Sequence, residues 1–369
     1  MKILIFNWRD IKNPQAGGAE LVTHEISKRW INSGHEVTLF TSQFPQSKKE
    51  EIIDKVKIIR SGQQWSVHWK AYLHYQKYFK GKFDIVIDEI NTIPFFTPLY
   101  VKERKIAYFN QLAREVWFYE SFFPISLLGY LLEPLYLRFY RNIPTMVISS
   151  STKKDLVSLG FKDVEVFPMA VDFEKTQKFL ADKEKNLTII YVGRLVYSKK
   201  VVDVIESFRI IIKKVKDAKL WVVGSGDKRY EEKLKKLVEK YSLKELVRFF
   251  GYVTQEEKYK LMSKATVIAI TSVREGWGLI VTEANSLKTP AVVYNSPGLR
   301  DAVIHNETGL ICENNNPDDL ANNILSLLNK NIYSRLQKNA HSDSRDRTWE
   351  KTAKEGLKII NRVLNVEPK

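Results

Sequence analysis

Cysteine is almost absent from this sequence, which has only Cys312 among its 369 residues. A lone cysteine excludes an intrachain disulfide and a zinc site built from several thiolates. The pattern Asp-x-Asp is missing altogether. Such a carboxylate pair commonly holds Mg²⁺ or Mn²⁺ beside phosphate groups. We therefore expect no metal site of either type, so that any bound phosphate must be met by protein cations or backbone amides.

Two further absences concern nucleotide hydrolysis and secretion. No G-x-x-x-x-G-K-[ST] motif occurs, which argues against a P-loop nucleotide hydrolase. The N-terminal run MKILIFNW is too short for a signal peptide and is followed by Arg9 and Asp10. We therefore predict a cytoplasmic protein.

Negative charge is in short supply, since 59 Lys and Arg outnumber 43 Asp and Glu and give a net charge of +16. The excess is spread over both halves of the chain and does not form a tail. A field of this sign favours polyanions, which include nucleotide phosphates, anionic lipid headgroups and nucleic acid. Charge alone does not choose among them.

The dominant pattern is a short apolar run, a turn and an amphipathic segment, repeated along the chain. The strand candidates of the first half are 2–8, 36–42, 56–60, 84–88, 105–109 and 145–149. The pattern restarts at Leu187, and the strand candidates of the second half are 187–192, 219–223, 247–250, 266–271, 290–294 and 309–312. Alternating strands and helices imply parallel sheets with right-handed crossovers. The sequence therefore predicts two doubly wound α/β domains in tandem.

A polar stretch that is poor in strand signals, residues 172–186, is the predicted linker. It separates a first domain, 1–171, from a second, 187–345, and the chain closes with the segment 346–369, which contains a helix candidate at 349–364. Ligands bind at the carboxyl ends of strands in such sheets. The cleft between two such domains is therefore the expected site.

Two aromatic segments raise the question of a membrane. Residues 117–140 are strongly apolar but are interrupted by Pro124, Glu133 and Pro134, and the uninterrupted piece is far shorter than the ~20 residues that span a bilayer. An aromatic helix pair packed in the first domain and a helix in peripheral contact with a membrane both fit this segment. The second segment, 65–83, carries aromatic residues at helical spacing, which we interpret as core. Binding of single-stranded nucleic acid is the alternative there.

Glycine pairs precede or follow several predicted helices and strands. Gly17 and Gly18 lie just before a helix, where backbone amides can approach a phosphate or a sugar hydroxyl. Gly224 and Gly226 follow a strand of the second domain. This G-x-G is a weak dinucleotide signal, and a tight strand-to-helix turn explains it equally well.

Cations and carboxylates gather at two strand ends of the second domain. The run Gly193 to Lys200 places Arg194 and Lys199 after its first strand, where a guanidinium fork and a compact ammonium suit a diphosphate. For Lys200 a solvated surface position is the simpler interpretation. The run Glu275 to Glu283 surrounds a helix start near Leu279, whose open amides suit an anion.

Taken together, these motifs resemble the retaining family-four glycosyltransferases of GT-B fold, the glycosyl transferases group 1. The matching stretches are, in chain order, AGGAE, GRLVYSK, GSGD, FFGYV, EGWGLIVTEA and SPGLRDAVIHNETGLI. The resemblance covers nearly the whole chain. It implies two Rossmann-like domains that face each other across a cleft, with the last helix crossing back onto the first domain.

The resemblance also implies roles for the motif residues. Arg194 and Lys199 would hold the diphosphate of a nucleotide-sugar donor, Glu275 would contact the hydroxyls of the donor sugar, and Glu283 would bind the ribose. The other residues predicted to contact the donor are Gly17, Gly18, Asn110, Gly193, Gly224, Gly226, Tyr252, Gly276, Trp277, Gly278 and Leu279. The family needs neither a metal nor a cofactor, because the nucleotide sugar is its substrate.

The sequence departs from the family pattern at two positions. The family usually has a histidine at the end of a first-domain strand, near the donor sugar, and this chain has Asn110, which can hydrogen-bond but cannot titrate. Lys200 stands where the family usually has glycine.

We therefore predict a retaining, metal-independent glycosyltransferase that acts on a nucleotide-sugar donor and a glycan or lipid-linked acceptor, in glycan or glycolipid assembly. It would be cytoplasmic, with peripheral contact at the inner face of the membrane as a further hypothesis. One alternative is a nucleotide-sugar isomerase of the same fold, which would need an acid/base pair near the sugar. The other is a non-catalytic binder of a polyanion or a membrane, among which nucleic acid is the least expected ligand.

Overall fold

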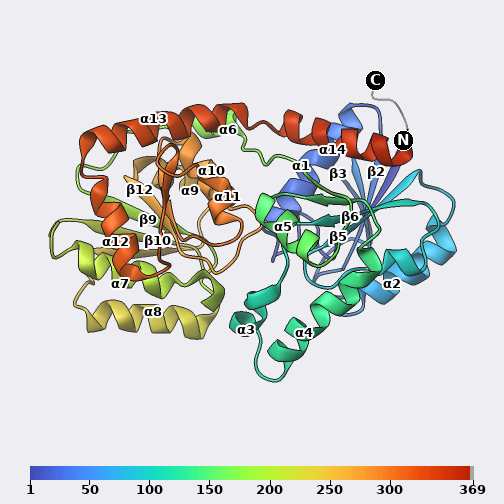
Figure 1. Cartoon of the computed structure of the whole chain (residues 1–369), viewed down its shortest axis with the longest axis horizontal. Coiled ribbons are helices and arrows are strands. Elements are labelled where there is room, and N and C mark those ends of the chain that lie inside the picture. Colours follow the sequence, from blue (N-terminus) through green and yellow to red (C-terminus); the bar gives the residue numbers. More distant parts are fainter. Residues whose placement is uncertain (366–369) are drawn as a thin grey trace. The chain divides into compact units, whose positions relative to one another are not determined.

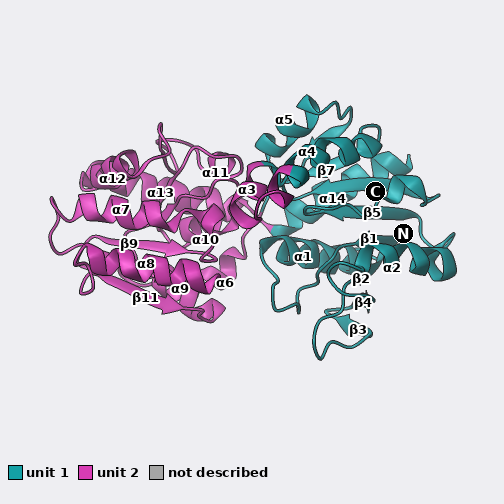
Figure 2. Cartoon of the chain, turned by 90° about the horizontal axis from the view of Figure 1, so that it is seen from below, with its two compact units in different colours: residues 1–114, 128–169, 349–369 teal, residues 115–127, 170–348 magenta. Residues whose placement is uncertain are grey.

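The computed structural model of the chain describes residues 1–365, which form two compact units (Figure 2). Unit 1 contains residues 1–114, 128–169 and the C-terminal segment from 349, and unit 2 contains residues 115–127 and 170–348. The division therefore falls near the predicted boundary at 171. Residues 115–127, which the sequence places in the first domain, pack with unit 2. The last four residues of the predicted segment 346–369 lie outside the described residues.

Unit 1 is built on an eight-stranded sheet in the order β3-β4-β2-β1-β5-β6-β7-β8. Its strands are β1 (Lys2–Phe6), β2 (Glu36–Thr41), β3 (Glu50–Ile53), β4 (Val56–Arg60), β5 (Ile85–Ile90), β6 (Arg104–Phe109), β7 (Thr145–Val147) and β8 (Val164–Val166). Neighbouring strands are parallel except for the antiparallel pair of β3 and β4.

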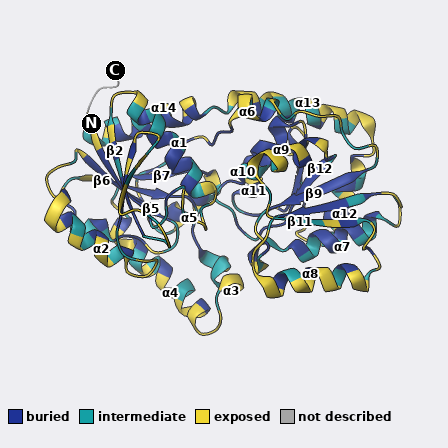
Figure 3. Ribbon diagram, turned by 180° about the vertical axis from the view of Figure 1, so that it is seen from behind, coloured by how far each residue is buried: buried dark blue, intermediate teal, exposed yellow. Residues whose placement is uncertain are grey.

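The helices of unit 1 cover both faces of this sheet (Figure 1). They are α1 (Gly18–Asn32), α2 (Val67–His74), α4 (Ile125–Leu137), α5 (Ser150–Ser158) and α14 (Trp349–Leu364), with the π-helix η1 (Tyr75–Phe79) and the 3-10 helices η2 (Thr97–Leu99), η3 (Arg114–Val116) and η4 (Arg138–Tyr140). The first three residues of α4 and the last two of η3 group with unit 2. Every residue of β5 is buried, as expected for a parallel strand covered on both faces (Figure 3).

The C-terminal helix α14 packs against α1 within unit 1 (Figure 1). The indole Nε1 of Trp30 donates to the carbonyl oxygen of Ala353 at 2.9 Å, and Trp30 is completely buried. Gly356 faces the same indole, because a Cβ on it would lie 3.0 Å from a ring carbon of Trp30. The end of the chain therefore completes the core that the first residues begin.

Unit 2 contains a six-stranded sheet in the order β11-β10-β9-β12-β13-β14, with all neighbours parallel. Its strands are β9 (Thr188–Val192), β10 (Lys219–Val223), β11 (Val247–Gly251), β12 (Val267–Ile270), β13 (Ala291–Val293) and β14 (Gly309–Ile311). Its helices are α3 (Trp117–Glu120), α6 (Phe173–Gln177), α7 (Val201–Ile211), α8 (Lys228–Lys240), α9 (Gln255–Lys264), α10 (Leu279–Ser286), α11 (Leu299–Ala302), α12 (Pro317–Ser326) and α13 (Lys330–Asp346), with the turn η5 (Tyr197–Lys199). The prediction of two doubly wound α/β domains is confirmed.

Side-chain caps start many of these helices at the residues where the sequence changes from turn to helix. Ser149, Asp227, Thr254, Asn316 and Asn329 each accept a hydrogen bond from a backbone N–H of the first turn. Such a cap satisfies an amide that has no partner inside the helix. Local chemistry therefore sets where these helices begin.

The interpretation of residues 65–83 as a buried aromatic stripe was wrong for its first turn. Trp65 is 81% exposed and Trp69 is 63% exposed, whereas Phe79 is buried. The buried face of α2 is formed by Val67 and Ala71. Helical spacing predicts that the aromatic residues share a face, and it does not say which face meets the sheet.

Helix α4 also has exposed residues along its length (Figure 3), and several of them are apolar. Leu128, Leu131 and Leu135 are exposed, whereas Glu133 and Leu137 on the opposite face are buried. Among residues 1–365, no helix is both long enough and apolar enough to cross a membrane.

Candidate functional site

In unit 2 several of the residues that are predicted to bind the nucleotide-sugar donor lie at the carboxyl ends of β9 and β12, two adjacent strands. Strands β10 and β11 lie on one side of β9, whereas β13 and β14 lie on the far side of β12, so the strand order reverses between β9 and β12. Open α/β sheets bind ligands at such a point. Arg194 and Lys199 follow β9, and Glu275 follows β12.

Lys199 and Glu275 form the central contact of this edge. The Lys199 Nζ lies 2.5 Å from Glu275 Oε1, and Ser272 Oγ donates to the same oxygen at 2.7 Å. Both charged side chains are four-fifths buried. An ammonium has three N–H donors and Glu275 takes one, so that Lys199 retains donors for an anionic ligand. Lys199 and Glu275 belong to two motifs that the sequence predicts to act together. They are 76 residues apart in the chain, and the structure brings them into contact.

Arg194 is 65% exposed and faces a carboxylate from the segment 115–127. Its guanidinium lies 3.9 Å from Glu120 Oε1, and Ser198 Oγ donates to that same oxygen at 2.5 Å. Arg274 and Glu115 form a second ion pair at 3.0 Å. Carboxylates of residues 115–127 therefore lie near Arg194, the residue that is predicted to bind the diphosphate.

Glycines allow the loops of this edge to approach one another closely. A Cβ on Gly224 would lie 2.0 Å from the carbonyl oxygen of Gly193, and one on Gly226 would lie 2.4 Å from that of Leu195. Both contacts are far shorter than real Cβ contacts. We conclude that the turn after β10 needs these glycines for packing, which is the simpler interpretation of the G-x-G. A role in donor binding stays a prediction.

The box from Gly276 to Leu279 forms the start of α10. Gly278 is its N-cap with φ of +98°, a left-handed conformation that favours glycine. The backbone amides of Leu279 and Ile280 have no helical acceptor, as at any helix start. Trp277 is buried, and its indole N–H donates to Thr282 Oγ1 at 3.0 Å, so that this side chain anchors the box.

Glu283 lies one turn further along α10 and is buried. Lys258 donates to both of its carboxylate oxygens, at 2.9 and 2.7 Å, and Gln255 donates to Oε1 at 3.2 Å. Side chains of α9 therefore orient Glu283, the residue that is predicted to bind the ribose. A carboxylate has about four acceptor positions, and Oε2 keeps one for a ribose hydroxyl.

Two other residues from the sequence analysis lie at the rim of this edge. Lys200 adopts φ of +49°, and its ammonium pairs with Asp203 at 2.9 Å. The predicted surface role of Lys200 is therefore compatible with its local pairing. Tyr252 follows β11 and is highly exposed.

In unit 1 a second polar cluster lies at the carboxyl ends of β1, β5 and β6, where that strand order reverses. Gly17 is the N-cap of α1, and its N–H donates to Glu20 Oε2 at 2.6 Å, while Arg9 donates to Glu20 Oε1 at 2.9 Å. The amide of Gly17 is therefore already used within the chain. Gly17 and Gly18 are both exposed.

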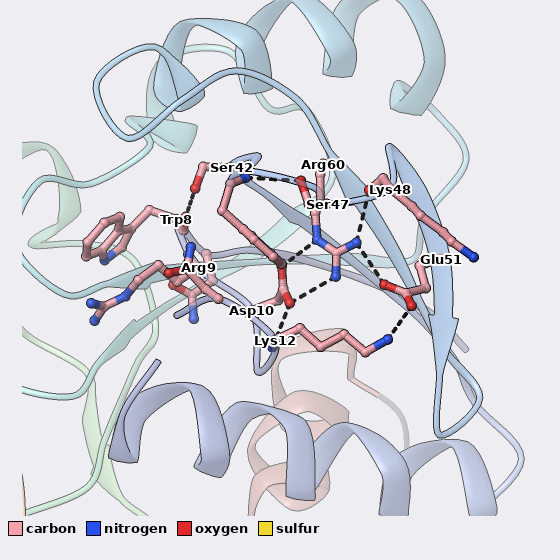
Figure 4. A network of polar contacts seen from close by, with 12 residues as sticks. Trp8, Arg9, Asp10, Lys12, Ser42, Ser47, Lys48, Glu51 and Arg60 are labelled. Carbon is pink, nitrogen blue, oxygen red and sulfur yellow. Dashed lines mark hydrogen bonds and ion pairs between the residues drawn. The ribbon is translucent and has the colours of Figure 1, made fainter. Parts of the chain in front are cut away.

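The loop between β1 and α1 is held by a buried ion pair (Figure 4). Arg60 donates to both oxygens of Asp10, at 2.7 and 3.0 Å, and neither side chain is exposed. Arg60 also donates to Glu51 at 3.0 Å, and Glu51 pairs with Lys12. Two parallel N–H bonds fix the orientation of a guanidinium as well as its distance. This network sets the path of the chain into the predicted Gly17–Gly18 motif.

Asn110 is buried among polar groups at the end of β6. Its amide Nδ2 donates to Glu89 Oε1 at 2.8 Å and to Asn91 Oδ1 at 3.0 Å, and Tyr108 donates to its Oδ1. Both amide hydrogens are thus committed inside the protein. Of the hydrogen bonds that an asparagine can make, only one acceptor position is left for a sugar hydroxyl.

Glu89 is the residue of this cluster that sequence analysis missed. It is completely buried, and it accepts from Thr23 Oγ1 at 2.7 Å as well as from Asn110. Burial raises the pKa of the Glu89 carboxyl to about 8, and the nearby Glu20 charge acts in the same direction. The only sequence signal was an acidic pair, Asp88 and Glu89, at the end of an otherwise apolar strand.

Other partners of the site were also missed. Ser272 and Lys258 orient the two predicted glutamates, and Ser198 contacts Glu120. Ser272 and Lys258 lie outside the quoted motifs, whereas Ser198 lies within GRLVYSK and was given no role there. Among residues 1–365 no group of three or more His, Cys, Asp or Glu side chains is arranged to hold a metal ion.

Comparison with known families gives two matches that join near residue 175. Residues 16–175 match the family described as Glycosyltransferase Family 4, and residues 172–343 match Glycosyl transferases group 1. The first match contains the polar cluster of unit 1, and the second contains the Lys199–Glu275 pair.

Curated relatives carry the same description. An uncharacterized glycosyltransferase of Methanocaldococcus jannaschii is 28% identical over 251 residues, covering 63% of this chain and 63% of the relative. An uncharacterized glycosyltransferase of Haemophilus influenzae is 28% identical over 58% of this chain and 60% of its own length. The chain thus spans less than two thirds of these two relatives. A second M. jannaschii glycosyltransferase is 26% identical, with 99% of each chain covered.

Solved structures share the fold over the whole chain. Sucrose-phosphate synthase from Thermosynechococcus elongatus superimposes with a TM-score of 0.79 at 19% identity, and 99% of each chain is covered. HepE from Anabaena, solved in complex with UDP and glucose, gives a TM-score of 0.76 at 15% identity, covering 98% of this chain and 100% of HepE. At these identities the likeness concerns the fold alone.

Proposed function

The chain belongs to the glycosyl transferases group 1, and from that premise we propose that it transfers a sugar from a nucleotide diphosphate donor to an acceptor hydroxyl. We further propose that the anomeric configuration is retained and that no metal ion is required. The observation that carries the proposal is the largely buried pair of Lys199 and Glu275 beside the start of α10.

The donor side of the proposal rests on charge. A nucleotide diphosphate gains negative charge as the sugar leaves, and fixed donors aimed at that charge lower the barrier. Lys199, Arg194 and the first amides of α10 are donors of this kind at one sheet edge. Glu275 would accept hydrogen bonds from the sugar hydroxyls and so orient the anomeric carbon.

The proposed step balances as a substitution at the anomeric carbon. The bond from that carbon to the β-phosphate oxygen breaks, and a bond to the acceptor oxygen forms on the same face. The proton of the acceptor hydroxyl passes to the departing diphosphate, which lies on that face. The products are the glycosylated acceptor and a nucleoside diphosphate.

The acceptor is proposed to be a glycan or a lipid-linked molecule, in a pathway of glycan or glycolipid assembly. The polar cluster around Glu89 and Asn110 supports an acceptor or donor-sugar site in unit 1, because its groups lie where the strand order reverses. A cytoplasmic location stays a prediction.

Calorimetric titration with nucleoside diphosphates in EDTA tests the donor site. UDP is the first probe, because HepE was solved with it, and GDP and ADP follow. We expect Arg194→Ala and Lys199→Ala each to weaken diphosphate binding at least about tenfold, or about 1.4 kcal/mol, while binding of the free nucleoside is unchanged. Glu283→Ala should weaken the binding of both the nucleoside diphosphate and the free nucleoside, because Glu283 is proposed to contact the ribose that both contain.

Lys235→Ala on α8 is the matched control, since it removes an exposed lysine of the same unit that belongs to none of the predicted donor motifs. Equal binding by the control and by both cation variants would remove the proposed diphosphate site. Glu275→Gln should lower kcat and leave UDP affinity intact. An effect of Glu275→Gln confined to the acceptor KM would contradict its donor-side role. Binding and turnover that depend on added Mn²⁺ would overturn metal independence.

A further inference from the structure

Helix α4 of unit 1 has an apolar face toward solvent, which is the reverse of an ordinary surface helix. Leu128, Leu131, Leu132, Leu135 and, in the following turn η4, Phe139 are all exposed. They recur at spacings of three and four residues and therefore lie along one stripe. Few soluble proteins expose contiguous apolar stripes of this kind without a binding partner.

The opposite face of this segment is fixed to the core of unit 1. Buried Glu133 accepts from the backbone amides of Ala113 and Arg114, each at 2.7 Å. The hydroxyl of Tyr140 donates to buried Asp88 at 2.5 Å. These polar contacts set the rotation of the helix, so that the leucine stripe has to face outward.

Helix α2 and the turn before it present a second apolar stripe. Trp65, Trp69 and Leu73 are spaced four residues apart, and all three are exposed. Val67 and Ala71 hold the other face of the helix against the sheet. The exposed tryptophans are the most unfavourable of these groups to leave in water, since an aromatic side chain is large.

The chain between β5 and β6 connects the two stripes. The rings of His68 and Phe95 lie 4.6 Å apart on the α2 side, and those of Phe96 and Phe139 lie 6.4 Å apart on the α4 side. The same stretch adds Leu99, which is exposed. We call the exposed apolar side chains of α2, of this stretch and of α4 with η4 the α2–α4 face; both helices lie on the lower side of unit 1 in Figure 1.

Cations predominate at the border of the α2–α4 face, where the carboxylate of Glu103 is engaged by the hydroxyl of Tyr75 and the amide of Gly81. Residues 61–83 contain four lysines and no aspartate or glutamate. The exposed cations of the α2 and α4 segments are Lys70, Lys77, Lys80, Lys82 and Arg138. Within residues 1–365, none of them forms a salt bridge with a carboxylate. A second copy of this chain would therefore bring like charges together, which disfavours self-association through this face.

We propose that the α2–α4 face binds the surface of an anionic phospholipid bilayer. Leucine and tryptophan side chains enter the boundary between headgroups and acyl chains, while the lysines remain at the phosphates. Tryptophan suits that boundary because its ring is apolar and its N–H can be hydrated. This membrane surface goes beyond the proposed transfer reaction and does not depend on it.

Vesicle co-sedimentation of the full chain tests the proposal directly. Wild-type protein should bind vesicles that contain phosphatidylglycerol at least tenfold more tightly than vesicles of phosphatidylcholine alone, and high salt should weaken that binding. Leu131→Gln/Leu135→Gln should lower the affinity at least tenfold. Replacing Lys70, Lys77 and Lys80 by Gln should lower it about a hundredfold, at about fivefold for each charge near an anionic surface.

Each variant has a control elsewhere on the surface. Ile52→Gln removes an exposed apolar side chain from β3, and replacement of Lys235, Lys236 and Lys240 by Gln removes three charges from α8. Both controls should bind phosphatidylglycerol vesicles like the wild type. Because the substituted side chains are exposed, all variants should keep the wild-type unfolding temperature.

Fluorescence reports on insertion in the wild-type protein as well. Vesicles brominated in the acyl chains should quench tryptophan emission, and Trp65→Phe/Trp69→Phe should lose most of that quenching. Three results would overturn the proposal: no preference for anionic vesicles, equal loss of binding in the control variants, or absence of quenching. Concentration-dependent dimerisation abolished by Leu131→Gln/Leu135→Gln would instead assign the face to a second copy. UDP affinity measured on the same samples keeps this outcome separate from that of the donor site.

Discussion

At the scale of single residues, the most consequential feature is the buried carboxyl group of Glu89, which forms no ion pair within residues 1–365. Glu89 is surrounded by the hydroxyl of Thr23 and the amide of Asn110, and both are neutral donors. Neutral hydrogen bonds do not offset the cost of removing a carboxylate from water. The proton therefore stays on this group up to a pKa of about 8.

This burial predicts how stability depends on pH. The folded protein holds the Glu89 proton between the ordinary carboxyl pKa of 4.5 and about 8, whereas the unfolded chain releases it. The contribution of Glu89 to stability is therefore complete below pH 4.5 and is lost as pH rises toward 8, at a slope on the order of 1 kcal/mol per pH unit.

Glu89→Gln should remove this slope, because glutamine keeps an acceptor for Asn110 and does not titrate. Urea unfolding of wild type and variant at pH 5, 6.5 and 8 measures the difference. We expect the stability of the variant relative to wild type to improve steadily from pH 5 to pH 8. Parallel pH curves would show that Glu89 is ionised in the folded protein.

At the scale of elements, the segment 115–127 brings acidic groups to the predicted donor residues. Glu120 lies on α3, and it contacts Ser198 and Arg194. A diphosphate that engages Arg194 would meet the negative charge of Glu120 at short range. If Arg194 binds the diphosphate as proposed, the charge of Glu120 opposes that binding.

Glu120→Gln should accordingly tighten diphosphate binding, while the hydrogen bond from Ser198 is kept. The expected gain is small, about two- to fivefold, because Arg194 is mostly exposed and the pair is screened by water. Titration with UDP at low and high salt measures it, and the gain should shrink at high salt. Glu174→Gln, an acidic residue of α6 outside this segment, is the control. Weaker binding by Glu120→Gln would show that the carboxylate helps to position the cation.

The elements themselves were largely predictable. The strand β4 and the helix α14 occur at their predicted bounds, because continuous apolar runs and a helical period are local properties of the sequence. The strands β3 and β8 were missed, since both are short edge strands with glutamate in them. Their formation depends on a neighbour to pair with, which the local pattern does not contain.

At the scale of the whole molecule, unit 1 is closed by the last helix of the chain. Gly356 of α14 lies against Trp30 of α1, where a Cβ would lie 3.0 Å from a ring carbon, a tighter contact than side chains normally make. The contacts with Gly356 and Ala353 contribute to the complete burial of Trp30. The stability of unit 1 therefore depends on residues more than 300 positions apart in the sequence.

Gly356→Val should destabilise unit 1 by about 1–3 kcal/mol, as overpacking of a well-packed core does. The measurement is thermal unfolding, with hydrogen exchange of the Trp30 indole N–H as the local readout. Lys354→Val is the matched control, because it places the same branched side chain on the exposed face of α14. If both variants unfold alike, the contact between α14 and α1 contributes little.

The sequence by itself determined the two α/β units and the strand ends at which Arg194, Lys199, Glu275 and Glu283 lie. Periodicity, caps and glycine turns act over a few residues, and parallel strands bring their carboxyl ends to one edge. The meeting of Lys199 with Glu275 follows from that topology. Their chemical roles stay predictions.

Only the tertiary structure decided which helix faces are exposed and which polar groups are already hydrogen-bonded or paired within the protein. It turned Trp65 and Trp69 outward, committed the amide of Asn110 to Glu89, and brought Glu120 to Arg194. Burial and hydrogen bonding depend on groups that are distant in the chain, so no local pattern carries them. For this reason the exposed α2–α4 face, which we propose to bind a membrane, and the buried carboxyl of Glu89 could be located only in the fold.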